Sequence, residues 1–385
     1  MNYIENLYKY LPTNNIINWD LITKELLNKY YLDMINTNQE PKWHGEGNVF
    51  IHTKMVCEKL INLEEYQNLI KINKLQVFLA ALFHDIGKIV CTKVVDDEIT
   101  STNHAITGSL IIREFLWKEL NLSGTKEYQN FRETICLLIK YHTNPIYIGK
   151  DYNEKRVIKL SLNQELANDF SLELLSILSK ADVLGRISND TVEQLLYLEQ
   201  FITLSKDLNC FKNAYKFTNN YTKYKYFRGN NIHYTEELYD NTKNEVIMIC
   251  GLPGTGKDTY INSHFSLPIV SLDQIREVNN LKDNDDQGVV FNIAKEEMKK
   301  YLRLNQSFIF NATNTHQINR QKLINLFADY NAKVHIIFLE TSWKENILRN
   351  NNREKSVNVK IIEKMLSSLD IPENYESHIV KWICI

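Results

Sequence analysis

Apolar and polar positions follow two different rhythms along the 385 residues of the chain. From about residue 41 to residue 201, apolar side chains recur every three or four positions, which is the period of an amphipathic helix. From Glu245 onward, short apolar runs alternate with longer amphipathic stretches, as in a parallel sheet covered by helices. The clearest expected helices are 74–83, 110–120, 131–141 and 172–180, and the expected strands are 246–250, 268–272, 308–310 and 334–339. These rhythms predict an all-α domain followed by an α/β domain with a mainly parallel sheet.

The boundary between the two domains is expected near residue 240, within a segment rich in Tyr, Lys and Asn. We therefore assign residues 1–240, including a connector, to the helical domain and residues 241–385 to the α/β domain. Within the connector, residues 212–234 interleave basic side chains with aromatic rings. Such side chains either follow a nucleic acid through charge and stacking or pack as an amphipathic segment between the domains.

Composition changes this picture little. Hydrophobic residues make up 44% and charged residues 24% of the chain, which is ordinary for a globular protein and excludes a disordered one. The net charge of −2 gives no indication of a nucleic-acid partner. The six cysteines are scattered without a C-x-x-C pair, and neither a signal peptide nor a membrane-length apolar run is visible. We therefore expect a cytoplasmic protein with reduced cysteines and no membrane partner.

A phosphate-binding loop follows the first expected strand of the second domain. The sequence from Gly251 to Thr259 reads GLPGTGKDT and fits G-x-x-x-x-G-K between a strand and an expected helix at 259–264. The glycines allow backbone N–H groups to converge on one anion, and Lys257 reaches the β- and γ-phosphates of a nucleotide. Asp258 stands where this motif has a Ser or Thr that ligates Mg²⁺. A carboxylate can hold Mg²⁺ directly or through water, and Thr259 offers a hydroxyl, so the metal role of Asp258 stays open.

Other polar residues follow the later strands at the same edge of the sheet. Asp273 is placed to accept a proton from an attacking hydroxyl, with Arg276 one helical turn on to hold a phosphate, although Asp273 could instead be a helix N-cap. Asn314 lies in a polar cluster that we expect to face the substrate. Arg349 and Arg353 suit a lid that clamps a triphosphate, or a solvated helix face. The predicted nucleotide-binding residues are Gly251, Gly254, Thr255, Gly256, Lys257, Asp258, Thr259, Arg349 and Arg353.

The segment from Val246 to about Leu366 resembles the 5′-hydroxyl polynucleotide kinases of bacteria and phages. The resemblance rests on the order of motifs: the P-loop, an Asp with Arg three residues on, Thr-Asn, and R-N-x-x-R-x-x-x-V. It implies that Lys257 binds the phosphates, Asp273 is the general base and Arg276 holds the acceptor phosphate. It also implies lid arginines at 349 and 353, and ATP or another NTP with Mg²⁺ as the cofactor.

Histidine and aspartate cluster in the helical half. The strings are WHGEG at 43–47, His52 before a Thr, FHDIGK at 83–88, His104, His142, and AD-x-x-GR at 181–186. A His-Asp pair within an apolar helix costs desolvation unless another group pairs with it. Imidazole and carboxylate together suit a first-row transition metal, so these residues predict a metal site.

These strings resemble the HD phosphohydrolase superfamily, an all-helical metal-dependent fold, and particularly the HD domains attached to tRNA nucleotidyltransferases. The resemblance covers a core of about residues 41–188. It implies that His52, His84, Asp85 and Asp182 bind one metal, while His104 and His142 complete a second metal site or contact the scissile phosphate. It further implies that Lys88 pairs with phosphate and that His44 reaches the substrate or braces its loop. One or two divalent transition metals such as Mn²⁺, Ni²⁺ or Co²⁺ would support phosphomonoester or phosphodiester hydrolysis.

The two resemblances together match the bifunctional RNA end-healing enzymes, in which an HD-domain phosphatase is fused to a P-loop 5′-hydroxyl polynucleotide kinase. This implies an enzyme that phosphorylates 5′-hydroxyl ends and removes 2′,3′-cyclic phosphates and 2′- or 3′-phosphates. The expected partners are RNA ends, with DNA ends as the alternative, an NTP, and a functional link to an RNA ligase. Two other hypotheses stay open: a small-molecule kinase joined to an HD nucleotidase, and an HD protein regulated by nucleotide binding without phosphoryl transfer.

Overall fold

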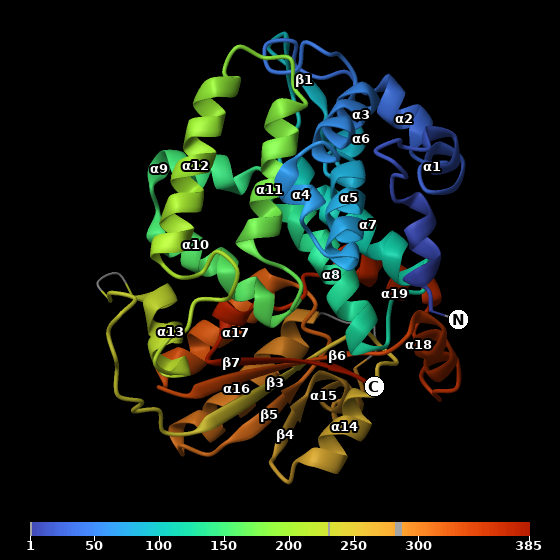
Figure 1. Ribbon diagram of the computed structural model, residues 1–385. Coiled ribbons are helices and arrows are strands. Elements are labelled where there is room, and N and C mark those ends of the chain that lie inside the picture. Colours follow the sequence, from blue (N-terminus) through green and yellow to red (C-terminus); the bar gives the residue numbers. More distant parts are fainter. Residues whose placement is uncertain (1, 230–231, 282–286) are drawn as a thin grey trace. The chain divides into compact units, whose positions relative to one another are not determined.

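The computed structural model describes residues 2–229, 232–281 and 287–385. The chain forms two compact units (Figure 1), the first comprising Met1–Leu122 and Glu127–Tyr215 and the second Ser123–Lys126 and Lys216–Ile385. Residues 216–240, which the sequence analysis groups with the helical half, are thus part of the second unit. Within the described residues, no helix combines the length and the apolar character that crossing a bilayer requires.

The first unit is helical, as its apolar period predicts. Its helices are α1 (Trp19–Glu25), α2 (Tyr31–Asn36), α3 (Val49–Leu60), α4 (Glu64–Gln67), α5 (Lys71–Phe83), α6 (Lys88–Cys91), α7 (His104–Lys118), α8 (Lys126–Tyr141), α9 (Asn144–Asp151), α10 (Glu154–Ser161), α11 (Leu172–Leu184) and α12 (Thr191–Asp207). Two 3₁₀ helices, η1 (Glu5–Tyr10) and η2 (Leu162–Glu165), complete the helical set given for this unit.

Helix α5 is the centre of the helical unit. Every residue from Leu75 to Phe83 is buried, in keeping with its nearly continuous apolar run. Helices α3 and α11 both pack against α5, and each begins at a residue whose side chain accepts a backbone N–H, Asn48 for α3 and Ser171 for α11. The buried centre therefore brings together three helices that carry parts of the His/Asp strings.

A small hairpin interrupts the helical unit. Strands β1 (Lys93–Val95) and β2 (Glu98–Thr100) pair antiparallel across Asp96 and Asp97, which both adopt left-handed backbone conformations with φ of 51° and 64°. Two consecutive residues with positive φ give the turn that joins tightly paired strands. The sequence analysis does not predict this hairpin, because its strands are too short for an alternating pattern.

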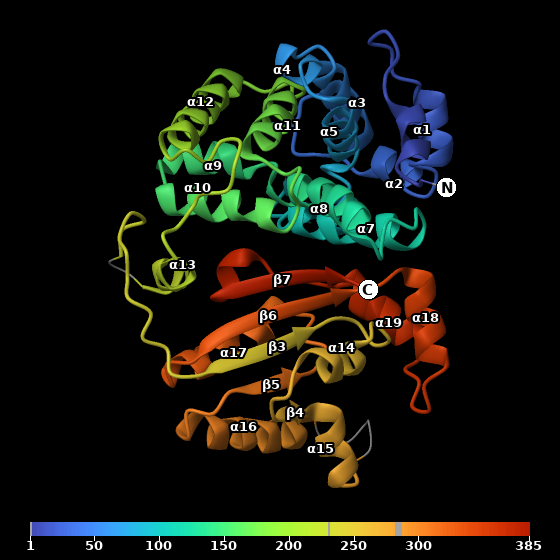
Figure 2. The same ribbon diagram turned by 60° about the horizontal axis from the view of Figure 1, so that its bottom comes forward.

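The second unit contains a five-stranded, all-parallel sheet, and this confirms the predicted α/β class. The strands are β3 (Glu245–Cys250), β4 (Ile269–Ser271), β5 (Phe308–Asn311), β6 (Lys333–Glu340) and β7 (Ile379–Cys384). Their spatial order is β4-β5-β3-β6-β7 (Figure 2). The four expected strands are present, whereas edge strand β7 lies in a terminal segment to which the sequence analysis gives no role. The order places β3 in the middle of the sheet, so the loop that follows it lies centrally.

Helices connect and cover the strands of this sheet. They are α13 (Asn220–Arg228), α14 (Lys257–His264), α15 (Leu272–Val278), α16 (Gln287–Arg303), α17 (Gln317–Asp329), α18 (Trp343–Asn351) and α19 (Val359–Ser367), with a 3₁₀ turn η3 (Asn374–Glu376) before β7. One core layer forms where Ile261 of α14 meets alternate residues of the strands, such as Ile249 and Leu339. This alternation is the two-residue period of a strand face.

The aromatic connector packs within the second unit. In α13, Tyr221, Tyr224 and Tyr226 are buried, and the Tyr224 ring stacks on the ring of His378 with centroids 3.8 Å apart. The Lys223 ammonium donates to the side-chain oxygen of Asn374. Of the two interpretations of this segment, the structure shows packing for these rings.

Candidate active sites

Three helices of the first unit bring four potential metal ligands together. His52 comes from α3, His84 and Asp85 from the end of α5, and Asp182 from α11, and all four are at most 2% exposed. His52 Nε2 lies 3.2 Å from His84 Nε2 and 3.1 Å from Asp182 Oδ1. Asp85 Oδ2 lies 3.5 Å from His52 Nε2 and 3.4 Å from His84 Nε2. Ligand atoms around one transition metal are roughly 3 to 3.5 Å apart, so this geometry fits a single divalent ion.

Asp85 also faces a second pair of histidines. Its other oxygen, Oδ1, lies 3.3 Å from His104 Nε2 and 3.9 Å from His142 Nε2. The three side chains satisfy the spacing of a metal site, with Asp85 shared between the two groups. The structure thus brings all six predicted metal-ligand residues into one continuous cluster.

Backbone carbonyl groups orient three of these imidazoles. Each ring places Nδ1 against the carbonyl oxygen three residues earlier, and because a carbonyl only accepts, Nδ1 carries the proton. The three bonds are His84 to Ala81 (2.7 Å), His104 to Ser101 (2.9 Å) and His142 to Ile139 (2.8 Å). In the neutral ring, Nε2 then presents its lone pair to the cluster, which is the form that binds a metal.

The second unit has its predicted phosphate-binding loop between β3 and α14. Its glycines, Gly251, Gly254 and Gly256, have φ of 149°, 84° and 84°, a region that residues with a Cβ rarely adopt. A Cβ at Gly254 would also lie 2.6 Å from the backbone oxygen of Asn346, which makes glycine the residue that fits there. The glycine spacing therefore reflects both conformation and a close approach.

The lysine of this loop folds back on its own backbone. Lys257 Nζ donates to the carbonyl oxygens of Gly251 (3.1 Å) and Leu252 (2.9 Å). Burial lowers its pKa to about 8, despite the opposing charge of Asp258. The Thr255 hydroxyl also donates to Leu252, at 2.9 Å, so this side chain holds the loop in shape. The loop presents Lys257 and backbone N–H groups where a phosphate would bind.

Each of the two sites lies within a part of the chain that matches a known protein-family model, apart from the loop that carries His44. Residues 49–186 match the model of the HD domain, and residues 246–372 match the model of an AAA domain. The chain combines an HD domain with an AAA domain. No curated protein matches it. The HD match contains all six metal-ligand candidates and the AAA match contains the whole P-loop, so the chain carries the machinery of a nucleotide- or phosphate-modifying enzyme.

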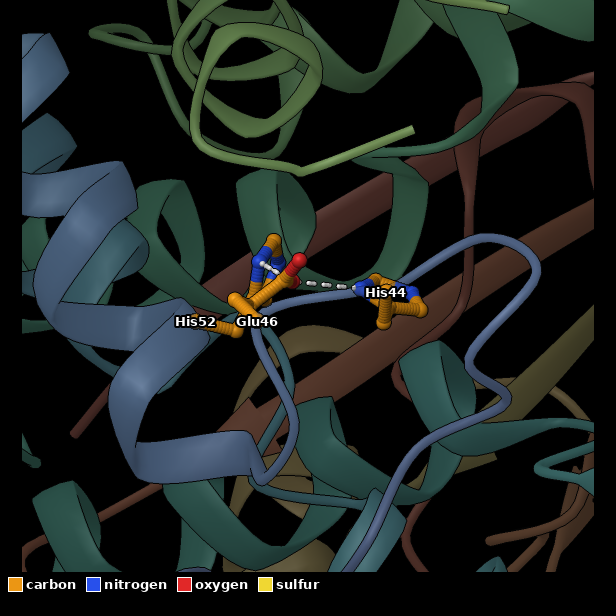
Figure 3. A group of neighbouring side chains, drawn as sticks. All are labelled: His44, Glu46 and His52. Carbon is orange, nitrogen blue, oxygen red and sulfur yellow. Dashed lines mark hydrogen bonds and ion pairs between the residues drawn. The ribbon is translucent and has the colours of Figure 1, made fainter. Parts of the chain in front are cut away.

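The loop before the HD domain match contributes a carboxylate that the sequence analysis did not assign. Glu46 Oε1 lies 2.8 Å from Nδ1 of both His44 and His52, and Figure 3 shows the carboxylate between the two rings. Glu46 Oε2 accepts the backbone N–H of Ile187 at 2.9 Å. A carboxylate on Nδ1 directs the opposite nitrogen of His52 toward the cluster, as outer-shell carboxylates do for metal-ligating histidines. The sequence offered one sign of this role, because Glu46 is the second polar residue of the WHGEG string.

Lys88 lies against the cluster of the HD domain itself. Its ammonium is 2.7 Å from Asp85 Oδ2, donates to Gln39 Oε1 at 2.6 Å, and lies 3.3 Å from His44 Nε2. If Lys88 pairs with phosphate, as the sequence analysis predicts, the phosphate would bind next to Asp85, a predicted metal ligand. The sequence analysis gave Gln39 no role, because a lone glutamine before WHGEG carries no distinguishing pattern.

Burial and neighbouring charges together set the protonation states of the His/Asp cluster. Burial alone would raise the pKa of Asp85, but Lys88 and His84 outweigh burial and hold it well below its usual range. Burial lowers the pKa of His142 to about 3 and that of His44 to about 4, so both rings are neutral near pH 7. Neutral imidazole and ionised carboxylate are the forms that bind a metal.

Asp182 has a cationic partner of its own. Arg186, one helical turn later, donates from Nε to Asp182 Oδ1 at 3.1 Å and from Nη2 to Oδ2. The same guanidinium donates from Nη1 to Gln194 Oε1 of α12 at 3.2 Å. This i,i+4 pair accounts for the arginine of the AD-x-x-GR string.

In the AAA domain, the departure from the P-loop motif has a specific partner. Asn311, at the end of β5, donates its side-chain amide to Asp258 Oδ1 at 2.7 Å. The amide oxygen of Asn311 is buried and has no hydrogen-bond partner within the described residues. The pair therefore offers oxygen atoms beside the phosphate loop, which is the ligand chemistry that Mg²⁺ prefers. Thr259, the hydroxyl considered as an alternative for this role, lies next to Asp258 in the first turn of α14, and both residues are exposed.

Asp273 and Arg276 lie together at the start of α15. Asp273 Oδ1 is 2.9 Å from Arg276 Nη1, and Arg276 Nη2 donates to Gln287 Oε1 at 2.7 Å. The N-cap of α15 is Ser271, so the alternative role of Asp273 as the N-cap is wrong. The Asp273 side chain is 83% exposed, which leaves its carboxylate accessible to a large substrate.

The side chain of Asn314 makes a hydrogen bond to the backbone of the AAA domain. Its side-chain amide donates to the backbone oxygen of Ile249 at 2.8 Å, and its backbone has a left-handed φ of 47°. The structure thus places Asn314 as a bridge to the end of β3. The substrate contact expected for this residue stays a prediction.

The two lid arginines lie on either side of the end of α18. Arg349 pairs with Glu345 at 2.6 Å, and its Nη1 approaches Gly256 so closely that a Cβ there would lie 3.3 Å away. Asn350 exchanges two hydrogen bonds with the backbone of Val357, at 2.7 Å and 3.0 Å, and so closes the exposed loop that carries Arg353. These contacts explain the Asn and Val in R-N-x-x-R-x-x-x-V.

Proposed function

We propose that the chain is an RNA end-healing enzyme. Its AAA domain would transfer the γ-phosphoryl group of an NTP to a 5′-hydroxyl end, and its HD domain would remove 2′,3′-cyclic phosphates and 2′- or 3′-phosphates. The main support is the presence in one chain of a His/Asp cluster that could hold a metal and of a P-loop domain with an Asp–Arg pair whose carboxylate is exposed. A break with a cyclic phosphate and a 5′-hydroxyl needs these two reactions before an RNA ligase can join its ends.

The kinase reaction depends on positioning and charge. Lys257 and the loop amides would bind the phosphates of the NTP, and Arg349 and Arg353 would neutralise the group in transfer. Asp273 would accept the proton of the 5′-hydroxyl, while Arg276, held beside it, would bind the phosphate that follows. An exposed base suits a polymer end, because a long acceptor cannot enter a closed pocket.

Mg²⁺ would neutralise phosphate oxygens in this reaction. The residues that would hold it are Asp258 and Asn311, through the carboxylate and the buried amide oxygen. A hard cation prefers such oxygen ligands, so the pair fits the ion although the motif lacks its usual hydroxyl.

In the HD domain, the convergent ring nitrogens and carboxylates fit one or two divalent transition metals. A metal held there would activate water for attack on phosphorus and neutralise a phosphate oxygen. Lys88 and His44, at the edge of the cluster, would hold the phosphate near the ligands. Glu46 fixes the rings of His44 and His52, so these groups need little rearrangement when substrate binds.

Transfer of label tests the proposal. The full chain is incubated with a γ-labelled NTP and either a 5′-hydroxyl oligoribonucleotide, a nucleoside or no acceptor, and separately with oligoribonucleotides ending in 2′,3′-cyclic phosphate. Label on the oligomer, together with loss of the cyclic phosphate, is expected. Label on nucleosides alone would favour a small-molecule kinase, and NTP hydrolysis without transfer would favour a nucleotide-gated regulator.

A further inference from the structure

A cavity of the first unit is lined by the loop that leads to His44. Its volume is about 520 Å³, and Lys42 and Trp43 line one wall while the segment from Asn189 to Leu196 lines the other. Trp43 directly precedes His44, whose ring nitrogen lies 3.3 Å from the Lys88 ammonium. We call this space the Trp43 cavity. It adjoins the cluster through consecutive residues of one short loop.

Hydrogen bonds fix the first wall to the metal cluster. Gly45 donates its N–H to the Ile187 oxygen at 3.0 Å, and the Ile187 N–H donates to Glu46, which also contacts His52. A Cβ on Gly45 would lie 3.0 Å from that same oxygen, so glycine permits this close approach. The loop that carries Trp43 is therefore held in place by the residues that orient a metal ligand.

The opposite wall is tied to the same cluster. Arg186 bonds both Asp182 and Gln194, and Gln194 in turn donates to Asp190 at the edge of the cavity. Both walls are thus connected to ligand side chains, one through Glu46 and the other through Arg186. A group bound in the Trp43 cavity would have a defined position relative to the cluster.

The chemistry of the walls favours an uncharged flat ring. Trp43 is 42% exposed, and Val192 and Leu196 expose 83% and 57% of their surface to the same side. The only cation of the lining, Lys42, already lies over the Trp43 ring, 4.6 Å from its centroid. The carboxylates of Asp190 and Glu193 repel phosphate from the opposite wall. Exposed indole beside apolar side chains is the surface on which nucleic-acid bases stack.

We propose that the Trp43 cavity binds the base of the nucleotide whose terminal phosphate the HD domain removes. This inference rests on the proposed function of the HD domain, and it names the part of the substrate that is recognised. Stacking on Trp43 would hold the base while His44 and Lys88 hold the phosphate. Because every base has a flat face, such a site accepts ends of any sequence but requires a base.

The test compares phosphate esters with and without a base. The probes are 3′-AMP and glycerol 2-phosphate, and the full chain carries Lys257→Ala so that the P-loop does not contribute nucleotide binding. Trp43→Ala is compared with Tyr147→Ala, which removes an exposed aromatic ring of α9 outside the cavity. The measurements are KM and kcat for hydrolysis, and equilibrium dialysis of each labelled ester.

Trp43→Ala is expected to raise KM and Kd for 3′-AMP about tenfold, with kcat nearly unchanged and with glycerol 2-phosphate unaffected. Tyr147→Ala should change neither probe. Equal losses for both esters, or no loss for either, would overturn the proposal, as would a parent protein that binds both esters equally well. If the parent protein hydrolyses neither ester, the proposed function fails, and base-dependent binding by dialysis still decides whether the cavity recognises a base.

Discussion

The His/Asp cluster of the HD domain and the P-loop site differ in where their ionisable side chains lie: the first buries them, and the second leaves its expected base exposed. In the HD domain, ionisable side chains from three helices face one another in the interior, and residues such as His52 and Asp85 are at most 2% exposed. In the AAA domain, phosphate binding rests on the backbone of one glycine loop, and the expected base, Asp273, is 83% exposed. The first site is built by tertiary packing, whereas the phosphate loop of the second is built by residues close in sequence.

This difference has an energetic consequence. Removing one member of a buried charge network leaves its partners unpaired in a medium of low dielectric, which costs several kcal/mol. Removing one member of an exposed pair costs about 1 kcal/mol or less, because water replaces the partner. Substitutions at the two sites should therefore have different effects. Those in the His/Asp cluster should reduce both activity and stability, whereas those at the kinase base should reduce activity alone.

The largest effect is expected from Asp85→Ala. This change removes the carboxylate shared by both halves of the cluster and leaves the buried ammonium of Lys88 without its charge partner. Phosphohydrolase activity should fall by more than about a hundredfold, and the free energy of unfolding of the HD domain by on the order of 3 kcal/mol. Activity assays and urea unfolding measure the two effects. Kinase activity should be retained, and its loss in a folded variant would contradict the partition of activities.

Asp273→Ala should give the complementary result. Loss of the proposed base should reduce 5′-kinase activity by about a hundredfold or more, while Tm should hardly change because the Asp273 carboxylate is exposed to water. The matched control is Glu277→Ala on the same helix, whose side chain is 68% exposed and pairs with Lys355. If both variants lose kinase activity equally, the loss reflects the helix and Asp273 is not the base.

Much of the fold followed from the sequence, because its elements have strong local signals. The apolar run of α5 and the glycine pattern after β3 each predict their structure without tertiary information. The spacing of Asp273 and Arg276 likewise predicted that they lie one helical turn apart, whereas their ion pair is seen only in the structure. Strand β7 escaped prediction because Lys381 interrupts its apolar run, and its place is set by pairing with β6.

The contacts around the predicted ligands were less accessible to sequence reasoning. Glu46 lies in a loop, and nothing local indicates that its carboxylate turns toward both His44 and His52. The contact of Lys88 with Gln39 joins residues far apart in the chain. The motif strings give residue types with metal affinity, whereas side-chain directions from loops depend on the packed structure.

Glu46→Gln tests whether the preorganisation of the HD cluster matters. The amide would place an N–H donor either against the Ile187 N–H or against the two imidazole N–H groups, so one set of contacts is lost. Metal affinity and phosphohydrolase activity should fall by roughly 10- to 100-fold. Glu58→Gln, on the exposed face of α3, is the control. Isothermal titration with Mn²⁺ reports the affinity, and an unchanged value would mean that Glu46 does not position His52.

The smallest effect concerns a buried histidine of the second unit, which shows that burial of an imidazole does not by itself mark a metal site. His378 accepts the Val334 N–H at Nδ1 at 3.0 Å and stacks on Tyr224. Burial lowers its pKa to about 3. Below about pH 6.5 the unfolded chain takes up a proton that the folded form binds only near pH 3, so stability falls as the pH decreases through this window.

His378→Asn should remove this pH dependence, because an amide oxygen can accept the same N–H without titrating. The stability of the wild-type protein relative to the variant should fall by on the order of 1 kcal/mol for each pH unit between pH 6 and 4.5. The ratio of hydrogen-exchange rates of the two proteins at the β6 amides measures this difference, since the intrinsic pH dependence of exchange cancels. A constant ratio over this range would show that His378 titrates alike in the folded and unfolded chain. Burial of His378 would then leave the pH dependence of stability unchanged, and the stability difference between the two sites would rest on the His/Asp cluster alone.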